Sequence, residues 1–325
     1  MKKLFAMGLA LAFGGLGLCT YLFFWAPSPK EQTVVVIEPS SLKAIQSLLR
    51  REGVLEHPFA FEMLARISGK SKKVQSGEYL FDRPSSPWQV LQTLSHGKVL
   101  LHKVTIPEGY TLADIGKLLS DEGLVTIDRF QDLVRNSDWI KSLNIDATSL
   151  EGYLFPDTYH FSKSESEKQI LQSMVKHMNQ AIKSLGPVPL SEYGWSRHDW
   201  ITFASIIEKE SSVLEEQPLI SSVFHNRLKK GMRLQSDPTV IYGIKNYDGN
   251  IRKKDLLTPT PYNTYTQKGL PPGPIASPGL SSLKAAVYPK ESAYLYFVAN
   301  RAGRHIFSEN YEDHLKAVAT YQLGK

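Results

Sequence analysis

The feature that most constrains the fold is a stretch of 22 uncharged, largely apolar residues at positions 4–25, directly after a Met-Lys-Lys start. At about 1.5 Å per residue, a helix of this length crosses the hydrocarbon core of a bilayer. Tyr21 and Trp25 suit the aromatic belt at the interface, and the two lysines favour a cytoplasmic N-terminus. The stretch predicts a transmembrane helix over residues 4–25, with residues 1–3 in the cytoplasm and the rest of the chain outside it.

A cleaved signal peptide is the alternative, because it shares the charged start and the apolar core. The small-x-small triplet at residues 26–28 precedes Pro29, which is unfavourable for cleavage, and the apolar run exceeds a usual signal core. Leu18 before Cys19 argues against a lipoprotein site. An uncleaved anchor is therefore the prediction.

Cys19 is the only cysteine, so the body of the chain cannot form disulfides, thiol nucleophiles or zinc-thiolate sites. With 325 residues, 42% of them hydrophobic, the chain can form two or three compact units. Its net charge of +6 is spread along the sequence without a run of five basic residues. We therefore expect no nucleic-acid partner.

An internal repeat organises the first half. Each copy reads as a short β-rich run, a helix closed by glycine and an aromatic strand: 33–37, 42–53 and 77–81, then 104–106, 112–123 and 152–155. Strand–turn–helix units also recur without common origin, which is the alternative. Two copies are too few for a solenoid, so the pattern favours two small α+β modules.

The segment 197–211 predicts an amphipathic helix with a glutamate on its apolar side. At about 100° per residue, Glu210 shares a face with Phe203 and Ile207. Desolvation raises the pKa of a carboxyl group, and a carboxyl protonated near neutral pH can act as a general acid. The alternative is a structural Glu210 that reaches water or pairs with a buried arginine.

Glu208 is the rival acid, but on a helix it points about 200° away from Glu210. We expect it to make a supporting hydrogen bond, or a salt bridge with Lys209 or Arg227. The chain has no Gly-x-Ser-x-Gly elbow, phosphate loop or His-Glu-x-x-His motif, and its nine histidines are scattered. A second catalytic carboxylate could come from Asp237, Glu208 or Asp157. We expect no metal and no cofactor.

Five ordered motifs resemble the endolytic murein transglycosylases, the MltG or YceG-like family. They are Ser205–Ser211 (Ser-Ile-Ile-Glu-Lys-Glu-Ser), Asn226–Leu228, Leu234–Tyr242, Tyr262–Tyr265 and Gly269–Gly273, and Glu151–Tyr159 adds to them. The resemblance covers nearly the whole chain. It implies that Glu210 is the catalytic residue of a lyase and that a LysM-like module precedes the catalytic domain.

The resemblance also implies cleavage of the β-1,4 bond between N-acetylmuramic acid and N-acetylglucosamine without water, leaving 1,6-anhydro ends on nascent strands. Substrate-binding or supporting roles go to Glu208, Ser211, Asn226, Gln235, Asp237, Asn263 and Tyr265. Asp237 could instead pair with Arg227. A hydrolytic muramidase and a non-enzymatic peptidoglycan-binding scaffold are the alternatives.

The fold predicted is α+β, with an anchor, LysM-like modules and a mixed α+β catalytic domain around a central helix. Its ranges are 1–3 (cytoplasmic), 4–25 (transmembrane), 33–100 (LysM-like), 101–160 (second related module) and 161–325 (catalytic). The expected place is the bacterial inner membrane, with the catalytic domain outside the cytoplasm. The expected partners are peptidoglycan strands, the membrane and peptidoglycan synthases.

Overall fold

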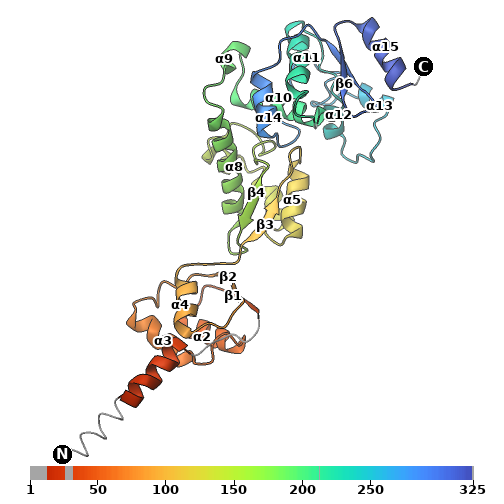
Figure 1. Cartoon of the computed structure of the whole chain (residues 1–325). Coiled ribbons are helices and arrows are strands. Elements are labelled where there is room, and N and C mark those ends of the chain that lie inside the picture. The colour runs from red at the N-terminus through yellow and green to blue at the C-terminus, as the bar shows by residue number, and fades with distance from the viewer. Residues whose placement is uncertain (1–12, 26–31, 212, 324–325) are drawn as a thin grey trace, which may run out of the picture. The chain divides into compact units, whose positions relative to one another are not determined.

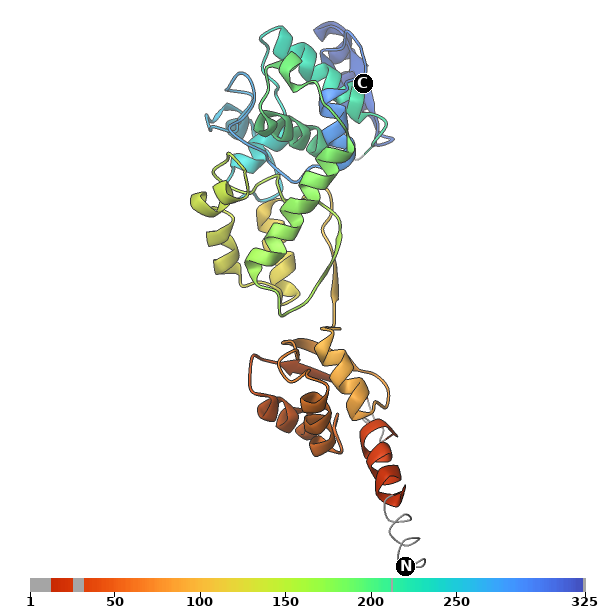
Figure 2. The same cartoon turned by 90° about the vertical axis from the view of Figure 1, so that its left-hand side faces the viewer.

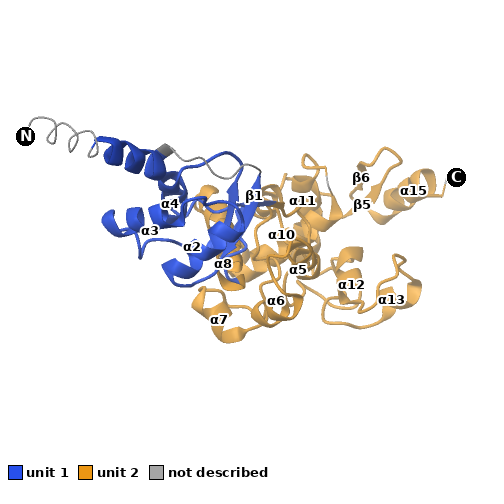
Figure 3. Ribbon diagram, turned by 90° about the horizontal axis from the view of Figure 1, so that it is seen from below, with its two compact units in different colours: residues 1–103, 160–166 blue, residues 104–159, 167–325 orange. Residues whose placement is uncertain are grey.

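The computed structural model describes residues 13–25, 32–211 and 213–323, in two compact units (Figure 3). Unit 1 comprises residues 1–103 and 160–166, as far as they are described, and unit 2 comprises residues 104–159 and 167–325. The fold is mixed α+β, with three two-stranded sheets among the described residues. The mixed fold class predicted from the sequence is confirmed.

Unit 1 is built on an antiparallel pair of strands, β1 (Thr33–Ile37) and β2 (Gly77–Phe81), with Val35 opposite Tyr79. Successive side chains of a strand point to opposite faces, so alternate residues are buried against the helices. Those helices are α2 (Leu42–Arg51), α3 (Pro58–Ile67) and α4 (Pro87–Ser95). Ser86 and Gln89 form a capping box at the start of α4, which satisfies two backbone N–H groups.

The start of the chain is described only from residue 13. Residues 13–20 are helical and continue into a π-helical turn, η1 (Tyr21–Trp25), where Phe24 lies 6.2 Å from the ring of Trp88. Within the described ranges, no helix combines the length and apolarity needed to cross a membrane. Residues 4–12 of the predicted span lie outside those ranges. The anchor stays a prediction, as does the LysM-like character of unit 1.

Unit 2 is mostly helical, and its elements follow one another along the chain (Figure 1). They are α5 (Leu112–Asp121), α6 (Ile127–Leu133), α7 (Ser137–Ser142), α8 (Glu167–Ser184), α9 (Leu190–Tyr193), α10 (Arg197–Glu210), α11 (Gln217–Lys229), α12 (Asp237–Gly243), α13 (Lys253–Leu257), α14 (Leu280–Val287) and α15 (Tyr311–Tyr321). The strands β5 (Tyr296–Ala299) and β6 (His305–Ser308) pair within unit 2, and β3 (His102–Thr105) pairs with β4 (Thr158–Phe161) where the chain passes from one unit to the other. Helix α15 lies against the β5–β6 hairpin (Figure 2).

Helix α10 is the centre of unit 2. All residues from Trp200 to Ile207 are buried, so this helix is covered on every side rather than on one apolar face. It packs mainly against α14, and the Trp200 indole Nε1 donates to the Leu283 carbonyl at 2.8 Å. Buried hydrophobic side chains supply most of the stability of such a core. The central helix is confirmed, and its burial fixes the position of its last residue, Glu210.

The predicted strand at residues 152–155 is wrong. This segment is a turn, and the strand that follows it is β4. Gly152 has φ +79°, a conformation that glycine adopts without steric cost, and a Cβ atom there would overlap the ring of Pro274. After Gly152, Tyr153 is buried in unit 2 and Phe155 is half-buried, and neither lies in a strand. The two repeat copies therefore share a strand and a helix but differ in the segment that follows.

Candidate active site

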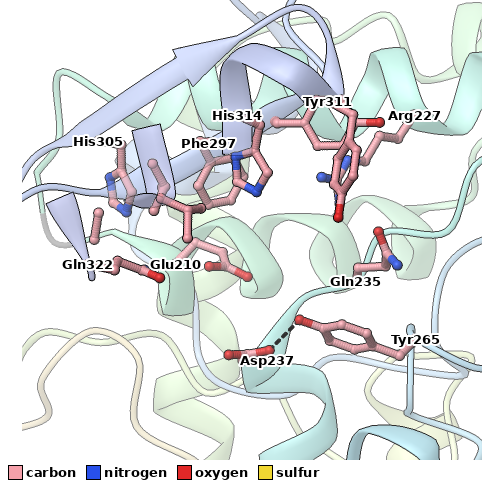
Figure 4. A pocket seen from close by; sticks show the side chains of 14 residues that line it. Glu210, Arg227, Gln235, Asp237, Tyr265, Phe297, His305, Tyr311, His314 and Gln322 are labelled. Carbon is pink, nitrogen blue, oxygen red and sulfur yellow. Dashed lines mark hydrogen bonds between the residues drawn. The ribbon is translucent and has the colours of Figure 1, made fainter. Parts of the chain in front are cut away.

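A cavity of about 440 Å³ lies at the C-terminal end of α10 (Figure 4). We call it the Glu210 cavity. Its walls come from α10, α11, the loop into α12, the β5–β6 hairpin and α15. It is lined by Glu210, Arg227, Gln235, Asp237, Tyr265, Tyr296, Phe297, Val298, Ala299, His305, Tyr311, His314, Val318 and Gln322.

Glu210 is the last residue of α10, because Ser211 has an extended backbone (φ −149°, ψ 131°). Burial raises the pKa of the Glu210 carboxyl to about 7, and the nearby Asp237 carboxylate acts in the same direction. The C-terminal end of the helix dipole also disfavours a negative charge. Two groups oppose these effects, a hydrogen bond from Ser236 and the positive charge of Arg227. The balance leaves a carboxyl that gains or loses a proton near neutral pH.

Ser236 is the direct partner of the acid. Its hydroxyl donates to Glu210 Oε1 at 2.5 Å, and the residue is 1% exposed. The Ser236 backbone N–H donates to Thr264 Oγ1 at 3.0 Å, and the Thr239 hydroxyl donates to the Ser236 carbonyl at 2.6 Å. These buried contacts fix the donor toward the carboxyl. Ser236 lies inside the motif Leu234–Tyr242, but nothing in the residue pattern singles out its hydroxyl.

Gln235 lines the cavity with a strained backbone. Its φ of +50° is in the left-handed region, which a residue other than glycine rarely adopts, and its backbone N–H donates to the Thr264 carbonyl at 3.2 Å. Strain of this kind costs about 1–3 kcal/mol and concentrates at functional sites. The predicted supporting role of Gln235 therefore agrees with its place in the cavity, and it stays a prediction.

Asp237 and Tyr265 form a pair at the edge of the cavity. The Tyr265 hydroxyl donates to Asp237 Oδ1 at 2.5 Å, and Asp237 is exposed. Burial raises the pKa of Tyr265, so its hydroxyl stays protonated. The pairing with Arg227, one of the two alternatives for Asp237, is absent from the described chain, where Arg227 donates to backbone carbonyls instead. The hydroxyl of Tyr265 is the side-chain partner of Asp237.

Arg227 is buried beside the acid and bound to backbone oxygens. Its Nη1 donates to the Leu234 carbonyl at 2.5 Å and its Nε to the Leu295 carbonyl at 2.7 Å, while its guanidinium lies 5.4 Å from the ring of Tyr296. Burial lowers the pKa of Arg227. The side chain ties α11 to the loop before α12 and to the segment before β5, and it places a positive charge near Glu210.

Four predicted residues lie outside the lining of the cavity. The Glu208 carboxylate accepts from the Gly279 N–H at 2.9 Å, so the expected hydrogen bond is present and the expected salt bridges are not found among the described ion pairs. Asn226 donates to the carbonyls of Ser292 and Tyr294. The Ser211 hydroxyl accepts from the Val213 N–H at 3.0 Å, and Asn263 Nδ2 donates to the Thr258 carbonyl at 2.7 Å.

Asn263 in particular is not placed to contact a sugar. It is completely buried, and its Nδ2 donates to the carbonyls of Asp255, Leu256 and Thr258. Its Oδ1 accepts from the Tyr265 N–H at 2.8 Å. Because these carbonyls end α13, Asn263 closes that helix and positions Tyr265. Its role is support of the cavity wall.

The C-terminal wall of the cavity was not predicted from the sequence. His305 and His314 both line the cavity, although they are far from Glu210 in the chain and nine residues apart from each other. Only the β5–β6 hairpin and α15 bring them there, and no sequence spacing could reveal it. No group of three or more His, Cys, Asp or Glu side chains in the described residues could hold a metal ion.

Three known proteins and one family provide the comparison. The sequence model of the YceG-like family matches residues 34–320. The endolytic murein transglycosylase of Bacillus subtilis is 34% identical, over 88% of this chain and 83% of that protein. The endolytic murein transglycosylase of Streptococcus pneumoniae serotype 2 is 31% identical over 92% of this chain, which spans 60% of that longer protein. The crystal structure of a yceG-like protein from Listeria monocytogenes has a TM-score of 0.61 at 33% identity and covers 89% of this chain and 99% of that chain.

Proposed function

The chain belongs to the YceG-like family, and from this membership we propose that it is an endolytic murein transglycosylase with Glu210 as its acid and base. The observation that carries the proposal is a glutamate with a pKa of about 7 in a cavity large enough for part of a glycan chain. A general acid works best when its pKa lies near the working pH. The substrate is then peptidoglycan.

In the reaction, protonated Glu210 donates its proton to the glycosidic oxygen between N-acetylmuramic acid and N-acetylglucosamine as the C1–O bond breaks. The Glu210 carboxylate then takes the proton of the muramyl C6 hydroxyl, whose oxygen bonds to C1 and closes a 1,6-anhydro ring. The proton count returns to its start, and no water is consumed. One carboxyl performs both steps, whereas a hydrolytic glycosidase uses two.

The neighbours of Glu210 suit this double role. The Ser236 hydroxyl favours the carboxylate that forms after proton donation, and Arg227 favours it as well. Burial and Asp237 favour the protonated form that must be present at the start. Because both forms are supported, Glu210 can give up a proton and take one back near neutral pH.

A muramidase is the second candidate, and one observation favours it. Asp237 supplies a second carboxylate in the same cavity, as the hydrolytic pair requires. The non-enzymatic scaffold is a third candidate, in which Glu210 has only a structural role. The products separate the first two candidates, and the Glu210→Gln variant tests the third.

The proposal extends to location and partners. The apolar residues 4–25 would anchor the chain in the bacterial inner membrane, with both units outside the cytoplasm. An anchored enzyme would meet strands where they are made, so peptidoglycan synthases are the proposed protein partners and release of nascent strands is the proposed outcome. A LysM-like unit 1 would add a second contact with glycan.

The test is mass spectrometry of the products after the full chain acts on uncrosslinked glycan strands, beside Glu210→Gln. Anhydro-muramyl ends from the unchanged protein alone support the proposal. Reducing ends would support the muramidase. The scaffold would be favoured if neither protein cleaves while both bind strands equally well.

A further inference from the structure

His305 is held at the Glu210 cavity by a buried carboxylate. Its Nδ1 lies 2.8 Å from Glu216 Oε2, and its backbone N–H lies 3.2 Å from both Glu216 oxygens. Glu216 is 7% exposed, so it needs a polar partner. A carboxylate accepts, so Nδ1 carries the proton in this pair and the other ring nitrogen, Nε2, keeps a lone pair in the neutral imidazole.

The Nε2 atom of His305, a residue that lines the cavity, has no hydrogen-bond partner in the described chain. It is also not one of the fully buried side-chain atoms without a partner, so a ligand can reach it. The side chain is 11% exposed and lines the cavity, with the ring edge-to-face on Phe297 at 5.3 Å. Figure 4 shows His305, Phe297 and His314 in a row above Glu210, with Asp237 and Tyr265 further below. A ring nitrogen without a partner therefore belongs to a fixed side chain that lines the space a substrate of Glu210 would fill.

Other aromatic residues that line the cavity suit a sugar ring. Tyr296 and His314 stack at 5.2 Å with an angle of 22° between their planes, and Tyr311 lies 5.7 Å from Tyr296 with 58% of its surface exposed. Sugars have apolar C–H faces and polar edges. A wall that combines aromatic surface with a few fixed polar groups fits both.

We propose that His305 is a substrate-binding residue and that Glu216 is its positioning residue. In the complex, His305 Nε2 accepts a hydrogen bond from a hydroxyl or an acetamido N–H of the N-acetylated glycan strand. The inference rests on the proposed function, and it adds the C-terminal wall of the cavity, from β5 to α15, to the glycan site. His305 takes no part in proton transfer.

The test measures the binding of uncrosslinked glycan strands to the full chain carrying Glu210→Gln, with and without His305→Ala. Loss of a hydrogen bond to an uncharged group should raise the Kd about threefold to tenfold. In the active protein, His305→Ala should raise KM by the same factor and leave kcat within about twofold. The reason is that the hydrogen bond between His305 and the sugar is present both in the bound substrate and in the transition state.

Two further variants separate this role from a structural one. Glu216→Gln keeps an acceptor for Nδ1 and should bind strands nearly as the parent does, whereas Glu216→Ala should match His305→Ala. His177→Ala is the matched control, because His177 pairs with the Asp157 carboxylate at 3.3 Å outside the lining of the cavity. It should leave Kd and KM unchanged.

The donor on the sugar is identified with short oligosaccharides. If His305→Ala binds both chito- and cello-oligosaccharides more weakly, the donor is a ring hydroxyl. If it binds only chito-oligosaccharides more weakly, the donor is the acetamido N–H. Unchanged strand binding by His305→Ala, while the unchanged enzyme releases anhydro products, would overturn the inference and leave the proposed function standing. If the unchanged protein neither binds strands nor releases anhydro products, both the inference and the proposed function are overturned.

Discussion

Glu210 lies between groups that shift its pKa in opposite directions, so single substitutions should move its titration in a known sense. Burial and Asp237 raise the pKa, and Ser236 and Arg227 lower it. The acid must be protonated before cleavage, so kcat/KM should fall as pH rises through a value of about 7. The midpoint of this fall reports the pKa of Glu210 in the free enzyme.

Ser236→Ala should move that midpoint to higher pH. The substitution removes the hydrogen bond to Glu210 Oε1, which favours the carboxylate. A hydrogen bond to a charged group contributes about 1.5–3 kcal/mol, so the midpoint should rise by about one to two pH units. The measurement is kcat/KM against pH. Ser211→Ala is the control, because the Ser211 hydroxyl contacts Val213 instead. A midpoint that stays in place or falls would contradict the assignment.

Asp237→Asn should move the midpoint in the other direction. It removes a negative charge near Glu210 and keeps an acceptor for the Tyr265 hydroxyl. Because Asp237 is exposed, solvent and salt screen the effect, and we expect a fall of about half a pH unit that shrinks at high salt. The same pH profiles at two ionic strengths measure it, with the exposed Asp128→Asn as control. An upward shift would exclude Asp237 as a cause.

At the scale of elements, the turn at Gly152 offers a sharp test of packing. Gly152→Ala forces an alanine to φ +79° and pushes its Cβ into Pro274, whereas Gly186 has φ +71° with open space around it. Positive φ costs about 1 kcal/mol, and overpacking adds about 1–3 kcal/mol. Thermal unfolding should therefore show a larger loss for Gly152→Ala than for Gly186→Ala. Equal losses would mean that Pro274 moves aside at little cost.

Elements with a strong local signal were predictable, and those that depend on tertiary contacts were not. The spacing of apolar residues predicted α2, α5 and α10, because each buries at least one helical face. Residues 152–155 have the aromatic composition of a strand, but they form a turn that is mostly buried and has no strand partner. Glu210 could be predicted from its own helix. Ser236 and His305 could not, because loops and strands far along the chain bring them to it.

At the scale of the molecule, Glu151 joins three parts of unit 2. It is 4% exposed, and its carboxyl accepts from the Leu112 N–H at the start of α5 and from the Tyr242 hydroxyl in α12. Burial raises its pKa from 4.5 to about 7, and the hydrogen bond from Tyr242 opposes that rise. In the sequence this residue stands out only as part of a motif, yet its protonation couples the stability of unit 2 to pH.

The sign of that coupling gives the last prediction. The folded protein holds the Glu151 proton up to a pH of about 7, but the unfolded chain releases it near 4.5. The folded state thus binds more protons in this window, and stability falls as pH rises, by about 3 kcal/mol for a shift of this size. Glu151→Gln keeps the neutral form at every pH, so its Tm should fall less between pH 5 and pH 8 than that of the unchanged protein. Part of the fall in Tm should remain, because the pKa of Glu210 is raised in the same direction.

The control is Glu122→Gln, an exposed change at the end of α5, which should keep the full fall in Tm. If Glu151→Gln also keeps the full fall in Tm, the buried Glu151 carboxyl does not control this pH dependence.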